Sequence, residues 1–427
     1  MNESGVPIAL TGIGCVLPGC ATPEEYWDRC AGGYTAIRPY ASEVVHTRRV
    51  PCFGHVAVEQ RRAAAEAVPP KLRKFCSSST QWGVKAARDA LSHAAFVPDS
   101  VPEDRRGLFT AQGDYLFPSI TSFAEGFGAL AGQIRPGLPE LTRECVLARG
   151  IDRFGVIKSL ANNLLAVTSL SLQFRGDCGA FVQDESAPVG AFRAALFSLR
   201  HGYADVALVV CAGSYDEALT VGELWQMGRL SDGLGGVASM RPFDAKRDGA
   251  FLGEGATAFL LERLPEVRLR GAKPVALVGG LADRFSCSTD SEDVHTYRMC
   301  AEQALVSTRT PLKAIDAIVA RGLAGREEDL REAELLRRLH SDAPITCVTP
   351  ITGLVPGCPL ELLAGVGLLS RGVVPPIPNL QEPICSRLPL YRTVADSRRV
   401  HHVLALSADW FGSHSAFHIS HPEAIPA

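Results

Sequence analysis

The stretch that decides the fold is Arg241-Pro242-Phe243-Asp244-Ala245-Lys246-Arg247-Asp248-Gly249, followed by Gly253-Glu254-Gly255. Taken alone, the glycines from 249 to 255 could form a loop that cradles a phosphate. Such a loop must lead into the N-terminus of a helix, whereas residues 256–261 continue as an apolar strand. The sequence therefore predicts a tight turn that enters a strand, and it argues against a nucleotide site.

Strands and helices alternate on both sides of this stretch. Residues 205–212 form a nearly continuous apolar run, which is typical of a strand covered on both faces. Apolar residues recur at helical spacing from Val189 to Leu199. A strand at 315–320 and a helix at 360–369 repeat the pattern later in the chain. We therefore expect an α/β protein with helices on both faces of its sheet.

A short sequence pattern occurs twice, which suggests that the chain contains an internal duplication. Pro7-Ile8-Ala9-Leu10-Thr11-Gly12 returns as Pro274-Val275-Ala276-Leu277-Val278-Gly279, each a short apolar strand entering a glycine turn. Between the two lies a charged stretch from Glu262 to Lys273, whose composition suits an exposed connection. We place the boundary there, which gives one half at residues 1–262 and a second at residues 263–427.

The composition excludes several classes of function. Of the 427 residues 46% are apolar and 21% charged, which is ordinary for a folded globular protein. The net charge of -3, without a basic run carrying interleaved aromatics, argues against nucleic acid as a partner. The 13 cysteines never form a C-x-x-C pair, so we predict no metal site and no cofactor, and expect a reducing compartment.

The N-terminal residues carry no basic segment, and no apolar run approaches the roughly 18 residues of a membrane span. We therefore expect a cytoplasmic protein that does not cross a membrane.

The stretch at 241–255 resembles the "RPFDxxRDGFxxGEGA" segment of β-ketoacyl synthases. Further matches follow in the family's order and spacing: Thr11-Gly12-Ile13-Gly14, Arg175-Gly176, Gly202 to Val206, and Gly372-Val373-Val374-Pro375-Pro376 with Asn379. The resemblance implies a thiolase fold, in which two similar βαβ-rich halves stack as alternating helix and sheet layers. It also implies an obligate dimer across the first half.

The family's nucleophile has no counterpart here. An active synthase uses a cysteine thiolate at a helix N-terminus, where the helix dipole lowers the thiol pKa. Counting without a gap from Arg175-Gly176 to Gly202 places that cysteine on Glu185, where non-catalytic relatives often carry glutamine. A carboxylate would form a mixed anhydride in place of a thioester, so acyl transfer through Glu185 is implausible. Glu185 could equally be an ordinary acid at a helix start, and Cys178 and Cys211 are more simply inert thiols than substitute nucleophiles.

The two histidines that stabilise the enolate in the family are also replaced. The first, in the "HGT" turn, matches Arg321, and the second, in "KxxxGH", matches Leu354, with Thr349 in place of the lysine. The loop "GFGGTN", which forms the oxyanion site and gate, matches residues 410–415, with Trp410 in place of a glycine and Phe411, Gly412 and His414 following. The side chain of Leu354 has no ionisable group, so it cannot act as an acid or a base.

Simpler interpretations remain for two of these residues. Arg321 could be a solvent-facing residue at a strand end, and His414 could be a loop histidine with satisfied hydrogen bonds. If the backbone follows the family, however, Glu185 and Arg321 come close together, and burial then requires them to pair.

The leading hypothesis is a chain length factor, the non-catalytic subunit of a ketosynthase heterodimer in type II polyketide or polyene biosynthesis, or in a fatty-acid-like pathway. Its partners would be a Cys-bearing ketosynthase subunit and an acyl carrier protein. Residues expected at the acyl tunnel and its gate are Arg153, Phe154, Gly155 and Phe117, with Phe123 and Phe127 deeper, although the aromatics could be ordinary core. Lys71, Arg73 and Lys74 could contact an acidic carrier protein or form a plain solvated face.

Two alternatives stay open. The chain could be a noncanonical thiolase-fold acyltransferase or decarboxylase rebuilt around Glu185, Arg321 and His414, which leaves its status as an enzyme uncertain. It could also be a homodimeric scaffold that binds acyl chains.

Overall fold

The structure is a computed structural model that describes residues 5–40, 51–113, 139, 152, 154–182, 186–287, 290–392 and 399–424. The first half comprises β1 Ile8–Val16, α1 Pro23–Gly32, β2 Arg38–Pro39, β3 Cys52–Gly54, α2 Val58–Ala67, α3 Ser78–His93, β4 Arg106–Gln112, α6 Gly155–Lys158, α7 Asn163–Leu172, β5 Cys178–Phe181, α8 Ala187–Arg200, β6 Val206–Ser214, α9 Ala218–Gln226 and β7 Leu252–Arg263. The second half comprises α10 Leu264–Leu269, β8 Ala276–Phe285, α11 Asp290–Ser307, β9 Ala317–Ala320, α12 Arg326–Leu339, β10 Ile345–Cys347, α13 Thr349–Thr352, α14 Leu360–Arg371, β11 His402–Ala408 and β12 Ser413–Ser420.

The strands repeat one topology twice. Their hydrogen-bonded order is β10-β9-β11-β12-β8-β1-β7-β6-β4-β5, with β2 and β3 attached to β7. At the centre β8 meets β1 through the pairs Ala9–Leu277 and Leu10–Ala276. With β2 and β3 left out, each half has five strands, and outward from this junction each half places its first strand, then its fifth, fourth, second and third. The sequence of antiparallel and parallel pairs is also the same in both halves.

The echo between residues 7–12 and 274–279 thus gives rise to the first strand of each half, β1 and β8. The proposed division of the chain at residue 262 falls at the end of β7. It stays a prediction.

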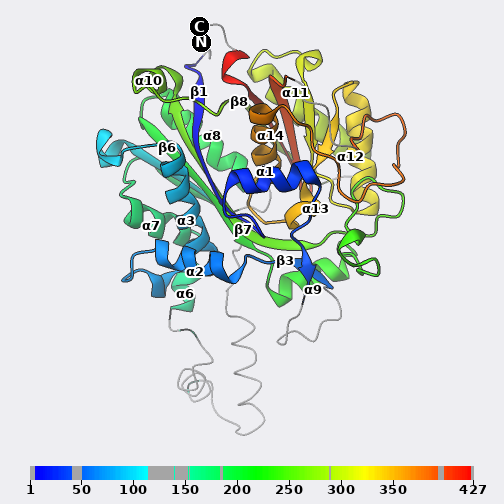
Figure 1. The fold of residues 1–427 in the computed structure, drawn as a ribbon, viewed down its shortest axis with the longest axis horizontal. Helices are drawn as coiled ribbons and strands as arrows, with labels where there is room; N and C mark the ends of the chain where they lie inside the picture. Colours follow the sequence, from blue (N-terminus) through cyan, green and yellow to red (C-terminus); the bar gives the residue numbers. More distant parts are fainter. Residues whose placement is uncertain are drawn as a thin grey trace.

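Helices separate and cover the two strand groups (Figure 1). In the middle, α8 packs on β4 and β6 while α14 packs on β9 and β11, and their apolar side chains share one core with both strand groups. On the outside, α3 covers β1, β6 and β7, and α11 covers β8 and β12. This arrangement confirms the expected α/β class with helices on both faces.

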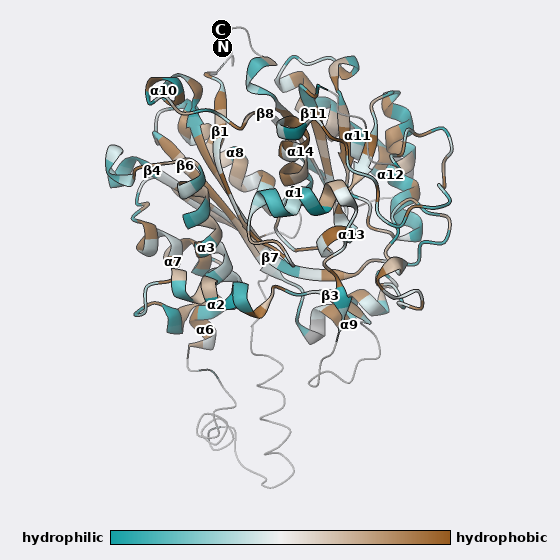
Figure 2. Ribbon diagram, viewed as in Figure 1, coloured by the Kyte–Doolittle hydropathy of each residue, from teal (hydrophilic) through white to brown (hydrophobic). Residues whose placement is uncertain are grey.

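Hydropathy explains the layering. Figure 2 shows brown, apolar strands at the centre and more teal, polar surface on outer helices such as α12. Every residue of β1, β4 and β9 is buried, as expected for strands covered on both faces. Within the ranges described above, no helix is both long and apolar enough to cross a membrane.

The glycine-rich stretch differs from its prediction. Gly249 has a φ of +137° but lies outside any turn, and Gly253 and Gly255 lie within β7, which begins at Leu252 and not at Ala256. Gly253 is needed for a different reason: a Cβ there would lie 2.6 Å from the Thr352 carbonyl oxygen. Glycine therefore permits the close approach of β7 to the turn before Leu354.

Candidate functional site

The Arg241–Gly249 segment fixes the loops around the site. Carboxylate oxygens of Asp244 accept hydrogen bonds from the backbone N–H groups of Lys246, Gln381 and Glu382 at 2.7–2.8 Å. Burial alone would raise the pKa of Asp244, but these donors lower it below its usual value. Arg247 donates to the carbonyl oxygen of Gly325 at 2.9 Å. The Arg241–Gly249 segment therefore fixes the position of the loop that follows β9.

Arg321 directly follows β9 and is fully buried, so the prediction of a possible solvent-facing residue is wrong. Its Nη1 lies 2.7 Å from Oε1 of Glu361, in the first turn of α14, and the two side chains are 1% and 2% exposed. Glu361 was not predicted from the sequence. Its signal was a single acidic residue in the otherwise apolar run from Leu360 to Leu369.

A second buried carboxylate binds the backbone at this point. Glu332 of α12 accepts hydrogen bonds from the N–H groups of Arg321 and Gly322, both at 2.8 Å, and from the hydroxyl of Tyr297 at 3.1 Å. Burial raises the pKa of Glu332, and the backbone donors oppose that rise. Glu332 was also missed, although it lies on the same helical face as Leu335, Leu336 and Leu339.

The positions that match the family's second histidine and its lysine carry no charge. Leu354 is fully buried and forms a β-bridge with Leu252 of β7, donating its N–H to the Phe251 carbonyl oxygen at 3.0 Å. Thr349 begins α13 and donates from Oγ1 to the carbonyl oxygen of Gly322 at 2.7 Å. Both side chains therefore serve packing and local backbone structure.

The residues matched to the gate loop fall in two places. Trp410, Phe411 and Gly412 connect β11 to β12, whereas His414 lies inside β12, so its placement in a loop is wrong. Nε2 of His414 lies 2.6 Å from Oδ1 of Asp293, and its ring stacks on Tyr297 with centroids 4.6 Å apart. The prediction of satisfied hydrogen bonds holds only in part, because Nδ1 of His414 is buried without a hydrogen-bond partner among the described residues.

Several predicted site residues lie outside the described residues, namely Glu185, Arg153, Phe117, Phe123 and Phe127. The expected pairing of Glu185 with Arg321 therefore stays a prediction. Phe154 and Gly155 are described at the start of α6: Gly155 is buried, and the ring of Phe154 meets that of Phe75 edge-on at 4.8 Å.

The thiols weighed as substitute nucleophiles lie elsewhere in the sheet. Cys211 is fully buried within β6, and burial raises its pKa well above the usual value. Cys178 is exposed at the start of β5. The thiol beside Arg321 is that of Cys347, which lies 3.2 Å from the Arg321 carbonyl oxygen and has a pKa that burial also raises. A neutral buried thiol is a poor nucleophile.

His55, Asp216 and Glu254 bring possible metal ligands within 4.8 Å of one another. Glu254, however, already accepts hydrogen bonds from Arg61 at 2.5 Å, from the N–H of Val56 at 3.0 Å and from the hydroxyl of Ser214 at 3.2 Å. The guanidinium supplies the positive charge that the carboxylate requires. These hydrogen bonds explain the position of the Glu254 carboxylate without a metal ion.

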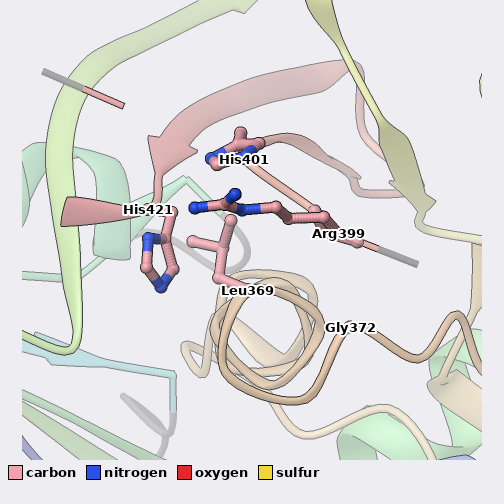
Figure 3. A pocket seen from close by; sticks show the side chains of 6 residues that line it. Leu369, Gly372, Arg399, His401 and His421 are labelled. Carbon is pink, nitrogen blue, oxygen red and sulfur yellow. The ribbon is translucent and has the colours of Figure 1, made fainter. Parts of the chain in front are cut away.

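A pocket of about 170 Å³, shown in Figure 3, lies beside the start of β11, whereas Trp410 follows the end of that strand. It is lined by Leu369, Gly372, Arg399, Val400, His401 and His421. Arg399 lies 2.6 Å from Glu423, so its charge is already compensated. None of the degenerate positions contributes to this pocket.

Comparisons with known proteins agree with this architecture. The family model for the β-ketoacyl synthase N-terminal domain matches residues 6–266, more than half of the chain. The tetracenomycin polyketide synthase ketoacyl synthase alpha subunit of Streptomyces glaucescens is 27% identical over 97% of both chains.

Two solved structures share the fold and confirm the thiolase-like prediction. The ishigamide ketosynthase/chain length factor has a TM-score of 0.83 at 21% identity, covering 98% of this chain and 100% of that one. A type II acyl-carrier protein complex with its ketosynthase bound to the hexaketide, AntDE:AntF, has a TM-score of 0.77 at 20% identity, with the same coverage of both chains.

Proposed function

We propose that this chain, which belongs to the β-ketoacyl synthase family, is the non-catalytic subunit of a type II ketosynthase heterodimer, a chain length factor. The observation that carries the proposal is the buried ion pair of Arg321 and Glu361 at the position where the family has its first histidine. Relatives named as ketoacyl synthase subunits of polyketide synthases, which match along nearly the whole chain, support the ketosynthase part of this proposal.

The chemistry of the site supports a subunit without its own condensation reaction. Decarboxylation of a malonyl group needs donors or positive charge aimed at the developing enolate. An arginine guanidinium is no base at neutral pH, and the charge of Arg321 is compensated by Glu361. Leu354 offers neither a donor nor an acceptor on its side chain. The described residues thus lack the acid–base pair of the family.

An edge strand supports association with a second subunit. β5 ends the strand order and, in the described part of the chain, pairs with β4 alone. Its residues alternate between exposed and half-buried, and an edge strand of this kind presents unpaired backbone groups that favour pairing with another chain. We assign the partner as a synthase that carries the missing cysteine and both histidines.

A carrier protein is the second proposed partner. Lys71 and Lys74 are exposed and Arg73 is half-buried, which places three positive charges around one turn beside α2. Nζ of Lys74 lies 4.9 Å from the ring centroid of Phe75 and 5.4 Å from that of Phe154, so the charge also adjoins the proposed tunnel gate. An acidic carrier protein is complementary to this cluster.

The tunnel assignment rests on the start of α6. Gly155 is buried at the first position of this helix, next to Phe154, whose ring is held against Phe75. We propose that the absence of a side chain at 155 leaves room for an acyl chain. Arg153 and Phe117 are proposed to complete this gate.

Co-expression tests the proposal. The chain should form a one-to-one complex with a Cys-bearing synthase from the same biosynthetic system, measured by size-exclusion chromatography with light scattering, and the complex should elongate malonyl units. Replacing Lys71 and Lys74 with glutamate should weaken carrier-protein binding to that complex. Lys313→Glu, an exposed lysine in the other half, is the matched control. A stable homodimer that condenses malonyl units unaided would refute the proposal.

A further inference from the structure

Three basic side chains meet at the start of β11. Arg399 and His401 are two positions apart in the segment that leads into this strand, and both line the pocket of Figure 3. The N–H of His421 donates to the His401 carbonyl oxygen at 2.8 Å, which continues the pairing of β11 with β12 by one residue. The two imidazole centroids lie 5.9 Å apart. One arginine and two histidines therefore share a single pocket.

The rest of the pocket wall is uncharged. Leu369 lies in the last turn of α14 and Gly372 just after that helix, and Val400 completes the lining. Figure 3 shows the Arg399 guanidinium between the two imidazole rings. A permanent positive charge at this point repels a metal ion, which two histidines could otherwise bind. The electrostatics therefore favour an anion as the ligand.

The basic side chains keep hydrogen-bonding groups for a ligand. Nδ1 of His421 accepts from the N–H of Glu423 at 3.3 Å, so the proton of the neutral ring is on Nε2, which can donate. Nδ1 of His401 is buried without a hydrogen-bond partner among the described residues. Of the five N–H donors of Arg399, only one on Nη2 is bound within the described part of the chain, to Glu423 at 2.6 Å.

The compensation of Arg399 by Glu423 is weak. Their side chains are 73% and 63% exposed, and ion pairs this exposed to water contribute little to stability. Asp316, the other nearby carboxylate, is already bound by the N–H groups of His401 and His402 at 2.7 and 2.9 Å. An anion that meets the guanidinium and both imidazoles at once can therefore displace the Glu423 carboxylate.

We propose that the pocket at the start of β11 binds a phosphate group, either as inorganic phosphate or as a small phosphate monoester. Donors that converge from the ends of two strands suit a tetrahedral oxyanion, which accepts hydrogen bonds in several directions, better than a planar carboxylate. The arginine fork can also bind two phosphate oxygens at once. This site is separate from Arg321 and Glu361, and it does not depend on the proposed function.

Isothermal titration calorimetry tests the site, on the chain or on its complex with a co-expressed synthase, with inorganic phosphate and glycerol phosphate as probes at constant ionic strength. Arg399→Gln should weaken binding at least about tenfold, because it removes charge-assisted hydrogen bonds. Glu423→Gln should strengthen binding about twofold to fivefold, since it removes the competing carboxylate. Both side chains are exposed, so these variants should fold. The matched controls are Arg337→Gln and Glu334→Gln, which alter an exposed ion pair on α12, away from the pocket lining, and should leave binding unchanged.

Three results overturn the inference. No saturable binding of either probe, or unchanged binding in Arg399→Gln, removes the phosphate site from this pocket. Acetate that binds as tightly as phosphate shows that the pocket does not select a tetrahedral oxyanion. Zinc that binds more tightly in Arg399→Gln and is lost in His401→Gln shows a metal site in its place. If the inference stands, tighter binding of glycerol phosphate than of inorganic phosphate identifies a monoester as the ligand, and equal or weaker binding identifies the free ion.

Discussion

Nη1 of Arg321 lies 2.7 Å from Oε1 of Glu361, although the two residues come from different elements and neither side chain is more than 2% exposed. Burying either charge without a partner would cost free energy. Each of the two side chains can therefore be buried only because the other compensates its charge. The position of Glu361 in the first turn of α14 adds a favourable interaction with the helix dipole. The position predicted to match the family's first histidine thus carries one member of a buried ion pair.

The energetic link between the two charges can be measured. Arg321→Ala should lower the free energy of unfolding by about 3–5 kcal/mol, because it leaves the Glu361 carboxylate buried without its partner. Adding Glu361→Gln should recover part of the loss. The matched control is Arg337→Ala, which removes an exposed ion pair with Glu334 and should cost about 1 kcal/mol or less. Urea titrations of the wild type, Arg321→Ala, Glu361→Gln, the double variant and Arg337→Ala give the values.

A double variant as unstable as the sum of its two single variants would contradict this account. It would mean that the two charges do not interact across the 2.7 Å contact.

The buried His418, together with the half-buried His402 beside it, predicts sensitivity of the fold to acid. Nδ1 of His418 lies 2.8 Å from Oγ1 of Thr308, and Nε2 lies 3.2 Å from Nδ1 of His402. Burial, and next the neighbouring His402, lower the pKa of His418 from 6.5 to about 4. The unfolded chain therefore takes up a proton first as the pH falls, so stability is complete above pH 6.5 and is lost progressively toward pH 4.

At about 1.4 kcal/mol per pKa unit, protonation of His418 alone should lower the free energy of unfolding by roughly 3 kcal/mol between pH 6.5 and pH 4. Chemical unfolding at pH 7, 5.5 and 4.5 measures it. His418→Gln should flatten the pH dependence, whereas His201→Gln, at an exposed position, should leave it intact. An unchanged slope in His418→Gln would show that other groups control acid stability.

The sequence predicted the class and the repeat because both depend on local patterns. Continuous apolar runs marked β6 and β9, and the echo at 7–12 and 274–279 marked the first strand of each half. The partners of the site residues could not be predicted in the same way. Glu361 is 40 residues from Arg321, and their contact depends on how α14 packs against β9.

The misplacement of His414 has a similar cause. A match to a family motif gives the order of residues but not the residue at which a loop ends and a strand begins. Here β12 begins at Ser413, which pairs with Phe285, and His414 pairs with Ala408 and Arg284.

Gly155→Phe should shorten the product of the reconstituted heterodimer without weakening its assembly. The new ring would enter the proposed acyl tunnel at the buried start of α6. Product length is read by mass spectrometry, and assembly by light scattering. Val156→Phe, at the next and 69% exposed position, is the matched control and should leave product length unchanged. An unaltered product distribution in Gly155→Phe would remove Gly155 from the tunnel wall.

The last prediction concerns residual catalysis. The purified chain should release no carbon dioxide from malonyl-carrier protein, because an enolate at this site would meet two carboxylates, Glu361 and Glu332, and one guanidinium that is already paired. The backbone donors of Arg321 and Gly322 are also occupied by Glu332. Leu354 contributes no donor in place of the second histidine.

Release of labelled carbon dioxide from malonyl-carrier protein is the measurement, with the Cys-bearing partner as the positive control. Turnover by the chain alone that exceeds a buffer control and disappears in Glu185→Ala would contradict the prediction. It would favour the alternative of an enzyme rebuilt around Glu185, because a carboxylate at the former nucleophile position would then be taking part in the reaction.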